Sequence, residues 1–266
     1  MKRNPRLKDK TVVITGASGG LGEQTAYRCA ASGANLVLLA RNLEKLEHVA
    51  SHIRRQFGVG CLPMQLDLAC PEEIPDVFHS IIDQTGGIDV LVNNAGYGIF
   101  AEAKDVSPAD VKGMFAVNVI GLIICTKEVI PSMKRRKSGH IINVSSQAGK
   151  LATPKSSVYS ATKHAVLGYT NSLRMELARD GVFVTAINPG PMATNFFELA
   201  DPSGNYVKNL GRYILSTEKV ADQMVAAMLT NRREINLPGW MNAGSLLYAW
   251  FPKLVERFGK KAFFKK

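Results

Sequence analysis

Two residues four positions apart, Tyr159 and Lys163, could carry out proton transfer. They belong to the segment YSATK, within a stretch whose apolar pattern predicts a helix over residues 157–179, so their side chains would emerge one turn apart on one face. A free phenol has a pKa of about 10, and a nearby ammonium lowers it by stabilising the phenolate. The pair could therefore exchange a proton near neutrality. The alternative is an ordinary surface helix, which can carry the same spacing.

A glycine-rich segment, TGASGGLG over residues 15–22, could hold a pyrophosphate. It follows a predicted strand and opens a predicted helix, which is the context of a dinucleotide-binding turn. Gly16, Gly20 and Gly22 would let backbone N–H groups approach the phosphates at the positive end of the helix. The spacing departs from GxGxxG because Thr25 stands where a third glycine or alanine is usual. A glycine-rich turn without a ligand is the alternative.

Arg41 follows the second predicted strand, where a carboxylate would otherwise hold the ribose diol of an adenosine. A carboxylate would repel a 2′-phosphate, whereas a guanidinium can form paired charge-assisted hydrogen bonds with it, and Ser18 could add a hydroxyl. We therefore expect NADP(H) in preference to NAD(H). The alternatives are that Arg41 only ends a solvent-facing strand, and that Glu44 reaches back as an acceptor.

Short β-branched runs alternate with longer amphipathic segments along the chain. This order predicts one α/β domain over residues 1–266, with a doubly wound, mostly parallel sheet of about seven strands and helices on both faces. The predicted strands are TVVIT, NLVLLA, CLPMQL, IDVLVNNAG, HIINVSS and VFVTAINPG, and the predicted helices cover residues 21–32, 43–57, 72–85, 108–134 and 157–179.

The complete set of motifs resembles the short-chain dehydrogenase/reductase family. The motifs are TGASGGLG, NNAG at 93–96, Asn118 in the following helix, IINVSS ending at Ser146, YSATK, and NPGPMAT at 188–194. The resemblance covers residues 10–238, and it is to the compact, single-domain branch, because NNAG is present and the C-terminal segment is too short for a second substrate domain. It implies a Rossmann-type fold and an NADP(H)-dependent oxidoreductase that interconverts a carbonyl and an alcohol by hydride transfer.

The resemblance implies four catalytic residues. Tyr159 would protonate the carbonyl oxygen as hydride reaches the carbonyl carbon, and Lys163 would lower the phenol pKa and bind the nicotinamide ribose. Ser146 would donate a hydrogen bond to the substrate oxygen, with Ser145 as the less favoured candidate. Asn118 would hold a water that links Lys163 to solvent. Read without the family, Asn118 is only a polar residue in an apolar helix.

The resemblance also implies the cofactor contacts. Pro189, Gly190 and Thr194 would surround the nicotinamide carboxamide, and NNAG would be a largely structural turn beside the adenosine. Asp67 would contact the adenine, although it could equally be a helix N-cap. The expected cofactor-binding residues are Gly16, Ser18, Gly20, Leu21, Gly22, Arg41, Asp67, Asn94, Ala95, Gly96, Tyr159, Lys163, Pro189, Gly190 and Thr194.

Composition narrows the partners. The formal net charge of +11 favours an anionic partner, but no nucleic-acid fold signature accompanies the basic runs, so we do not expect nucleic-acid binding. No histidine falls within the motifs, and no metal site is expected. The four scattered cysteines indicate a reduced, cytoplasmic protein. No apolar stretch is expected to reach the length needed to cross a bilayer.

The segment 191–215 predicts a long loop that covers the substrate. Its aromatic and apolar residues could enclose a lipophilic ketone or aldehyde, or they could simply dock the loop on its own domain. These residues are Phe196, Phe197, Leu199, Tyr206 and Tyr213.

The segment 240–266 predicts a basic amphipathic extension. One face of a single helix would carry Leu247, Phe251, Leu254 and Phe258. Such a segment could make weak peripheral contact with an anionic bilayer. It could also pack against the protein's own core or against a sister subunit.

Two other functions fit the same fold. A nucleotide-sugar epimerase or dehydratase would also accept glycines at Gly16, Gly19 and Gly22, but NNAG, the short C-terminal segment and Ser146 argue against it. A non-catalytic NADP-binding regulator would need the glycine-rich turn and not the catalytic residues. The family resemblance further implies a homodimer or homotetramer, built from the helices that carry Asn118 and Tyr159.

Overall fold

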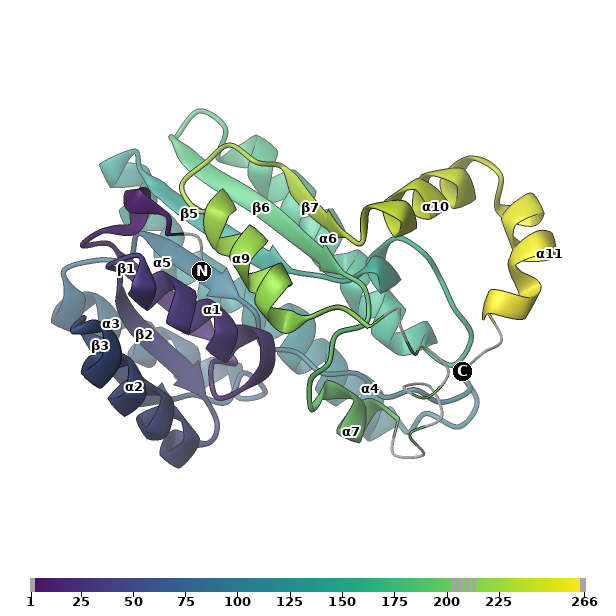
Figure 1. Ribbon diagram of the computed structural model, residues 1–266, viewed down its shortest axis with the longest axis horizontal. Coiled ribbons are helices and arrows are strands. Elements are labelled where there is room, and N and C mark those ends of the chain that lie inside the picture. The colour runs from purple at the N-terminus through teal and green to yellow at the C-terminus, as the bar shows by residue number, and fades with distance from the viewer. Residues whose placement is uncertain (1–2, 202–203, 205–207, 209–210, 212–213, 264–266) are drawn as a thin grey trace.

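The computed structural model describes residues 3–201, 204, 208, 211 and 214–263. It has three layers, with a seven-stranded sheet in the middle and helices on both faces (Figure 1). The strands are β1 (Thr11–Thr15), β2 (Asn35–Ala40), β3 (Cys61–Gln65), β4 (Val90–Asn93), β5 (Gly139–Val144), β6 (Val182–Pro189) and β7 (Glu234–Leu237). The strand order is β3-β2-β1-β4-β5-β6-β7, and every neighbouring pair is parallel. The expected doubly wound parallel sheet is confirmed.

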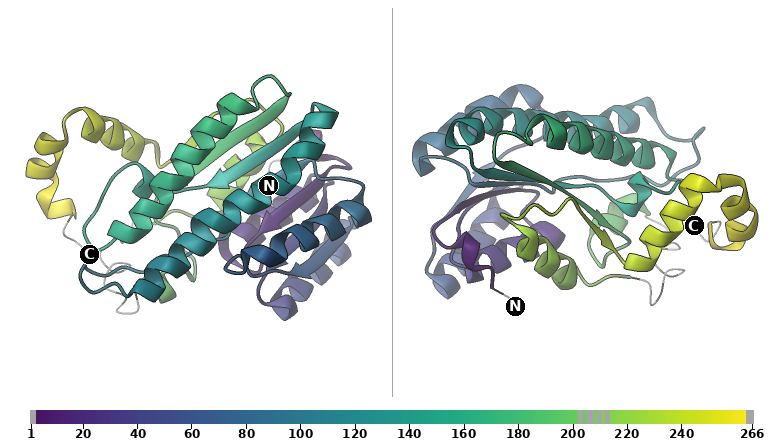
Figure 2. Two further views of the ribbon diagram at one scale, coloured as in Figure 1. Left: turned by 180° about the vertical axis from the view of Figure 1, so that it is seen from behind. Right: turned by 90° about the horizontal axis from the view of Figure 1, so that it is seen from above.

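Helices cover both faces of the sheet (Figure 2). The helical elements are η1 (Pro5–Leu7), α1 (Gly20–Ala31), α2 (Leu43–Phe57), η2 (Pro71–Glu73), α3 (Ile74–Thr85), α4 (Pro108–Phe115), η3 (Ala116–Gly121), α5 (Leu122–Arg136), η4 (Gln147–Gly149), α6 (Ser157–Glu176), α7 (Phe196–Ala200), α9 (Thr217–Ala227), α10 (Gly239–Trp250) and α11 (Pro252–Phe263). α1, α2 and α9 pack on one face, and α3, α5 and α6 pack on the other.

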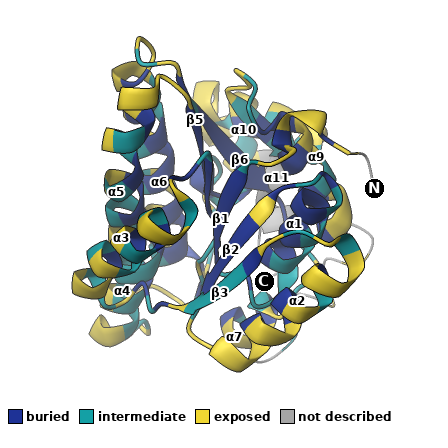
Figure 3. Cartoon of the chain, turned by 90° about the vertical axis from the view of Figure 1, so that its left-hand side faces the viewer, coloured by how far each residue is buried: buried dark blue, intermediate teal, exposed yellow. Residues whose placement is uncertain are grey.

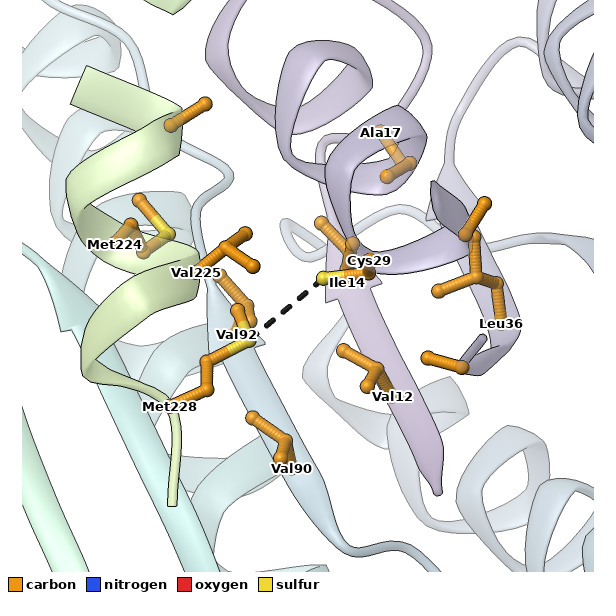
Figure 4. Packing of buried hydrophobic residues seen from close by; sticks show 14 of the residues in the cluster. Val12, Ile14, Ala17, Cys29, Leu36, Val90, Val92, Met224, Val225 and Met228 are labelled. Atoms are coloured by element: carbon orange, nitrogen blue, oxygen red, sulfur yellow. Dashed lines mark hydrogen bonds between the residues drawn. The ribbon is translucent and has the colours of Figure 1, made fainter. Parts of the chain in front are cut away.

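The sheet has a core on each side because successive strand residues point to opposite faces. Val12 and Ile14 of β1 pack with α1 and α9, whereas Val13 between them packs with α3 and α5. Figure 4 shows the first of these cores, where Cys29 of α1 lies 3.7 Å from the sulfur of Met228 after α9. The inner strands of the sheet are buried, the edge strands β3 and β7 are mostly half-buried, and the outer helix faces are exposed (Figure 3).

α4, η3 and α5 form one continuous helical rod over residues 108–136. At 29 residues it is long and apolar enough to cross a membrane by length and composition, so the expectation that no apolar stretch reaches this length is wrong. In this fold the rod packs against α3 and the sheet, and Cys125, Val129 and Met133 lie in the core. Its apolar composition therefore has a packing explanation.

The expectation of a single helix in the C-terminal segment is also wrong. α10 ends at Trp250, Phe251 has φ −133° and ψ 60°, and α11 begins at Pro252. Proline has no N–H and disfavours helical backbone in the residue before it, so the helix stops there. Leu247 therefore belongs to a different helix from Leu254. The side chain of Phe258 lies outside the described part of the structure.

β5 carries a histidine, His140, that is fully buried. Its Nδ1 accepts a hydrogen bond from the Leu229 backbone at 2.8 Å, so Nε2 carries the proton and donates to Thr185 Oγ1 at 2.8 Å. Burial lowers the pKa of His140 to about 3. The neutral ring thus joins β5, β6 and the segment after α9.

We expect the chain to lose stability as the pH falls below 6.5, the ordinary pKa of histidine. The folded pKa is lowered, so the contribution is complete above the unfolded pKa and is lost as the pH falls toward about 3. Each pH unit in this window corresponds to about 1.4 kcal/mol. Urea unfolding followed by circular dichroism between neutral and mildly acidic pH measures the slope.

His140→Gln is the matched variant because an amide does not titrate in this range. It should be less stable than the parent at neutral pH, by about 1–3 kcal/mol for the disturbed hydrogen bonds, yet its stability should depend less on pH. Equal slopes for the parent and the variant would show that His140 is not responsible.

Candidate active site

A cavity of about 860 Å³ opens at the carboxyl ends of the strands. Its walls include the residues that follow β1, β2, β4, β5 and β6, and the strand order reverses between β1 and β4 at its centre. Such a reversal is where open parallel sheets bind ligands, because the connections leave opposite faces of the sheet and a crevice remains.

The glycine-rich turn, which follows β1, forms part of the floor of this cavity. Gly16 has φ +66°, and a Cβ there would lie 2.8 Å from Ala95 Cα. Gly20 has φ +57°, and α1 begins at this residue, so its first N–H groups face the cavity without a side chain in between. Ser18 and Leu21 also line the cavity. The turn can therefore receive an anion at the helix end.

Gly22 differs from the other glycines because it does not line the cavity. A Cβ at this position would collide with the carbonyl oxygen of Gly16 and approach Asn94. Gly22 thus permits close packing of α1 against the turn and is not placed to contact a ligand. Thr25 is fully buried and donates a hydrogen bond to the carbonyl of Leu21 at 2.7 Å, so it packs without needing a glycine.

NNAG ties the end of β4 to the end of β1. Asn94 Nδ2 donates to the carbonyls of Thr15 at 2.9 Å and Gly16 at 3.1 Å. Thr15 Oγ1 in return accepts the backbone N–H groups of Asn94 and Ala95, each at 3.0 Å. Asn94, Ala95 and Gly96 also line the cavity. NNAG therefore links the ends of β1 and β4 and also forms part of the cavity wall.

Arg41 lies at the cavity end beyond the glycine-rich turn. It is exposed, and it lines the cavity together with Asn42 and Lys45, which the sequence interpretation did not single out. Glu44, the alternative acceptor, does not line the cavity. This end consequently carries two cationic side chains, and the spacing of Arg41 and Lys45 across the start of α2 was the available signal.

Asp67 also lines the cavity, and its expected adenine contact stays a prediction. Its carboxylate accepts the backbone N–H of Ala69 at 2.9 Å, and its carbonyl accepts that of Cys70 at 3.0 Å. The side chain therefore stabilises a turn. It is not a helix N-cap, since η2 begins only after Cys70.

Tyr159, Lys163 and Ser146 meet at the opposite end of the cavity. The Lys163 Nζ donates to the carbonyl of Val144 at 2.9 Å and lies 5.8 Å from the centroid of the Tyr159 ring. Lys163 is only 4% exposed, and burial lowers its pKa to about 8. α6 and the end of β5 thus bring a phenol, an ammonium and a hydroxyl into one space.

The two neighbouring serines have different environments. Ser146 Oγ accepts the backbone N–H of Ala148 at 3.0 Å and lies 3.4 Å from the Pro189 carbonyl, which is a long and weak contact. Ser145 is buried, and its hydroxyl donates to the carbonyl of Lys163 at 2.9 Å. Ser145 therefore anchors α6, while Ser146 is the better placed of the two to donate into the cavity.

Asn118 does not line the cavity but lies behind it, fully buried in the π-helical turn η3. Its Oδ1 accepts the Tyr97 N–H at 3.0 Å, and its Nδ2 donates to the Tyr97 carbonyl at 2.8 Å and to Thr162 Oγ1 at 3.1 Å. A Cβ on Gly96 would lie 3.0 Å from Asn118 Oδ1 and 3.3 Å from Lys163 Nζ. Asn118 therefore joins the β4 turn to α6 close to the ammonium.

Pro189, Gly190 and Thr194 line the cavity; the Pro189 carbonyl lies next to Ser146, whereas the Thr194 side chain lies next to Gly20. A Cβ on Gly190 would lie 3.0 Å from the sulfur of Met241, which comes from α10 and also lines the cavity. Met241 was not identified from the sequence, because only the packing of α10 against β7 and η4 brings it here.

An aromatic cluster covers the side of the cavity next to Tyr159. The ring centroids of Phe196 and Tyr159 are 5.5 Å apart, and Phe100 lies 6.0 Å from Tyr159 and 6.2 Å from Phe196. Phe100 was missed because its segment has no periodicity and only the fold brings it to α7. Phe197 is buried and lines the cavity as well, so α7 both contributes to the cavity wall and is anchored to the domain. Leu199 also lines the cavity.

Two residues of the expected substrate loop, Tyr206 and Tyr213, lie outside the described residues. In the rest of that segment, a single bridge joins Met192 to Leu215, so the ends of the loop are held together.

Comparison with known proteins identifies close similarities. A family model described as short chain dehydrogenase matches residues 10–203. An uncharacterized oxidoreductase of Staphylococcus epidermidis is 34% identical over 232 residues, covering 87% of this chain and 96% of that protein. A short-chain dehydrogenase from Sphingobium yanoikuyae, solved in complex with NADPH, has a TM-score of 0.80 at 26% identity, with 97% of this chain and 96% of that chain covered.

A further solved structure has the same fold. A short chain dehydrogenase/reductase from Burkholderia phymatum, in complex with NAD, has a TM-score of 0.85 at 24% identity, with 93% of this chain and 95% of that chain covered. The sheet and its surrounding helices are thus shared.

The burial of Lys163 should make the ligand-free chain less stable than it could be. Its folded pKa is about 8 against an ordinary value of 10.5, so the penalty is complete below about pH 8 and disappears as the pH rises to 10.5. The penalty is on the order of 3 kcal/mol. Lys163→Met should therefore gain stability relative to the parent near pH 7, and the gain should shrink as the pH rises. Denaturant unfolding at neutral and alkaline pH measures the difference, which would stay constant if the ammonium were not the cause.

Proposed function

The chain belongs to the short-chain dehydrogenase family of oxidoreductases, and we propose that it uses NADP(H) to interconvert a lipophilic ketone or aldehyde and the corresponding alcohol. One observation carries the proposal: the Tyr159 phenol and the Lys163 ammonium share a cavity with a side-chain-free, anion-receiving helix end. An NADP molecule is long enough to extend from the helix end to the Tyr159 end of the cavity. Its nicotinamide would lie near Tyr159 and its phosphates at Gly20.

The residues present fit such a cofactor. Gly19 and Gly20 line the cavity where α1 begins, so no bulky side chain stands between the first N–H groups of the helix and the cavity. The backbone there is consequently open to a pyrophosphate. Arg41 and Lys45 provide positive charge at the adenosine end, and Ser18 adds a hydroxyl. A 2′-phosphate is the chemical group best suited to that charge.

When bound, the nicotinamide supplies the hydride that reaches the carbonyl carbon. The chain supplies the proton: Tyr159 Oη gives it to the carbonyl oxygen, so that the products are an alcohol and a phenolate. Ser146 Oγ donates a hydrogen bond to the same oxygen and stabilises its developing negative charge. In the direction of oxidation the Tyr159 phenolate accepts the proton of the alcohol, and the oxidised nicotinamide accepts the hydride.

Lys163 has two tasks in this proposal. As an ammonium close to the phenol, it stabilises the phenolate and so lowers the phenol's pKa. In the direction of reduction it also passes the replacement proton to the phenolate from a water held by Asn118, whose Oδ1 retains a second lone pair for that water after accepting the Tyr97 N–H. Phe100 and Phe196 exclude bulk water from this end and favour an apolar substrate.

Tyr159→Phe tests the proton donor. The variant removes one oxygen and should keep NADPH affinity, while turnover of a carbonyl substrate should fall roughly 100- to 10,000-fold. NADPH consumption across carbonyls graded by size and polarity measures the turnover, and NADPH fluorescence measures the binding. Tyr27→Phe is the matched control, because the Tyr27 hydroxyl donates a hydrogen bond to Glu23 on α1 at 2.8 Å and Tyr27 does not line the cavity. Unaltered turnover in Tyr159→Phe would reject the assignment.

Arg41→Asp tests the cofactor preference. A carboxylate at this position would repel a 2′-phosphate and could accept from the ribose diol, so NADPH affinity should fall roughly 10- to 100-fold and preference should move toward NADH. Titrations with both cofactors measure the change. Arg55→Asp makes the same charge change on an exposed part of α2 that does not line the cavity, and it should bind NADPH like the parent. If Arg41→Asp also binds NADPH normally, the 2′-phosphate site lies elsewhere.

A further inference from the structure

α10 and α11 project away from the sheet at the end of the molecule where β6 and β7 finish (Figures 1 and 2). α10 packs against β7, η4 and α11. A hydrogen bond of 3.1 Å from Tyr248 Oη to Glu256 joins the two helices. The pair therefore forms a defined projection attached through the inner face of α10.

The outer face of α10 is apolar and exposed. The helix has no charged residue, and Leu246, Leu247 and Trp250 are 58%, 55% and 78% exposed. Its inner face carries the buried Ser245 and the partly buried Met241 and Asn242. Phe251, in the turn between the helices, and Leu254, at the start of α11, are also exposed. We call this surface the C-terminal apolar patch; it consists of Leu246, Leu247, Trp250, Phe251 and Leu254.

We propose that the C-terminal apolar patch docks the protein on an anionic lipid surface. The charges next to the patch select this partner. Lys253 and Arg257 are exposed on α11 beside Leu254, and from Pro252 onward the sequence contains six basic residues and one acidic residue. The basic residues are Lys253, Arg257, Lys260, Lys261, Lys265 and Lys266, and the acidic one is Glu256. Apolar side chains flanked by lysine and arginine are suited to a bilayer interface with negative headgroups.

The same charges disfavour a second copy as the occupant. Two copies that met patch to patch would bring two strongly basic segments together, and like charges repel at such distances. An anionic lipid surface carries the opposite charge, so these cationic side chains attract the protein to it.

The dimensions of α10 define how it would lie. Twelve residues of helix extend about 18 Å, whereas the hydrocarbon core of a bilayer is about 30 Å thick. α10 therefore cannot span a bilayer by itself and would lie in the plane of the interface, with Trp250 and Leu246 inserted among the headgroups and upper acyl chains.

Docking would place the candidate active site next to the bilayer. Met241, in the first turn of α10, lines the cavity, and its sulfur lies beside Gly190. One helix thus provides a cavity wall on its inner face and the apolar patch on its outer face. A lipophilic carbonyl dissolved in the bilayer would have a short path to the cavity; this consequence rests on the proposed function, whereas docking itself does not.

Co-sedimentation of the full chain with vesicles tests the proposal without any activity measurement. The protein should bind vesicles that contain phosphatidylglycerol and should bind phosphatidylcholine vesicles far more weakly, with affinity decreasing as salt is added. Trp250→Gln should weaken binding by at least about tenfold, and Lys253→Gln and Arg257→Gln by about fivefold each. Met175→Gln, at a 72%-exposed methionine on α6, is the control and should bind like the parent.

Three outcomes would overturn the proposal: no binding to anionic vesicles, equal binding by Trp250→Gln and the parent, or a patch occupied by another copy. Light scattering detects the last, because Trp250→Gln would then reduce the oligomeric mass. Turnover of a water-soluble carbonyl by Trp250→Gln should match the parent, which separates loss of docking from misfolding. If the proposed function were wrong, neither the parent nor any variant would turn over the carbonyl, whereas vesicle binding would still be observed.

Discussion

The close approach of two strand ends is the constraint on which the cavity depends. Thr15 and Asn94 hold the carboxyl ends of β1 and β4 together through four hydrogen bonds between side chain and backbone. Gly16 has room for no side chain between them. With this brace in place, the chain can leave β1 on one face of the sheet and β4 on the other and still keep an open crevice. Everything that lines the crevice is positioned relative to this pair of turns.

The second constraint is the burial of an ammonium, and it opposes stability. Lys163 is almost completely enclosed, and the carbonyl of Val144 compensates only part of the lost hydration. A buried polar ladder beside it, in which Asn93 bonds Thr126 and Asn143 and Asn143 bonds Thr170, holds β4, β5, α5 and α6 in register. A buried ammonium is destabilising in isolation, and the surrounding hydrogen bonds hold it in position.

Much of the fold could be predicted from the sequence because its signals are local. The β-branched runs at β1 and β2 and the apolar repeat of α2 have the predicted bounds. β7 was not located, since its four residues, EINL, alternate with Glu234 and Asn236 and resemble a loop. A single C-terminal helix was predicted because the apolar repeat runs across Pro252. That prediction neglected the proline, which lacks an N–H and ends the helix there.

The site was predictable to a different extent. Most of the site residues predicted from motifs with short spacing, such as YSATK and the glycine-rich turn, line the cavity, although Gly22 and Asn118 do not. Phe100, Lys45 and Met241 line the cavity without any motif. Phe100 and Met241 reach the cavity through tertiary packing, against α7 and on α10, which no local pattern encodes, whereas Lys45 follows Arg41 by four residues, a spacing that the sequence shows.

The π-helical turn η3 divides the long rod into α4 and α5, whose residues are out of register around the helix axis. Each residue of an α-helix advances about 100° around the axis, so the extra residue accommodated in η3 lets α4 and α5 each face its own neighbours. A one-residue deletion within Ala116–Gly121 would restore regular α-helical hydrogen bonding through this turn. It would also rotate α4 relative to α5 about the helix axis. Either Asn118 would then swing away from the Tyr97 backbone, or Cys125 and Val129 would turn out of the core. Chain length in this turn is therefore as much a part of the design as residue identity.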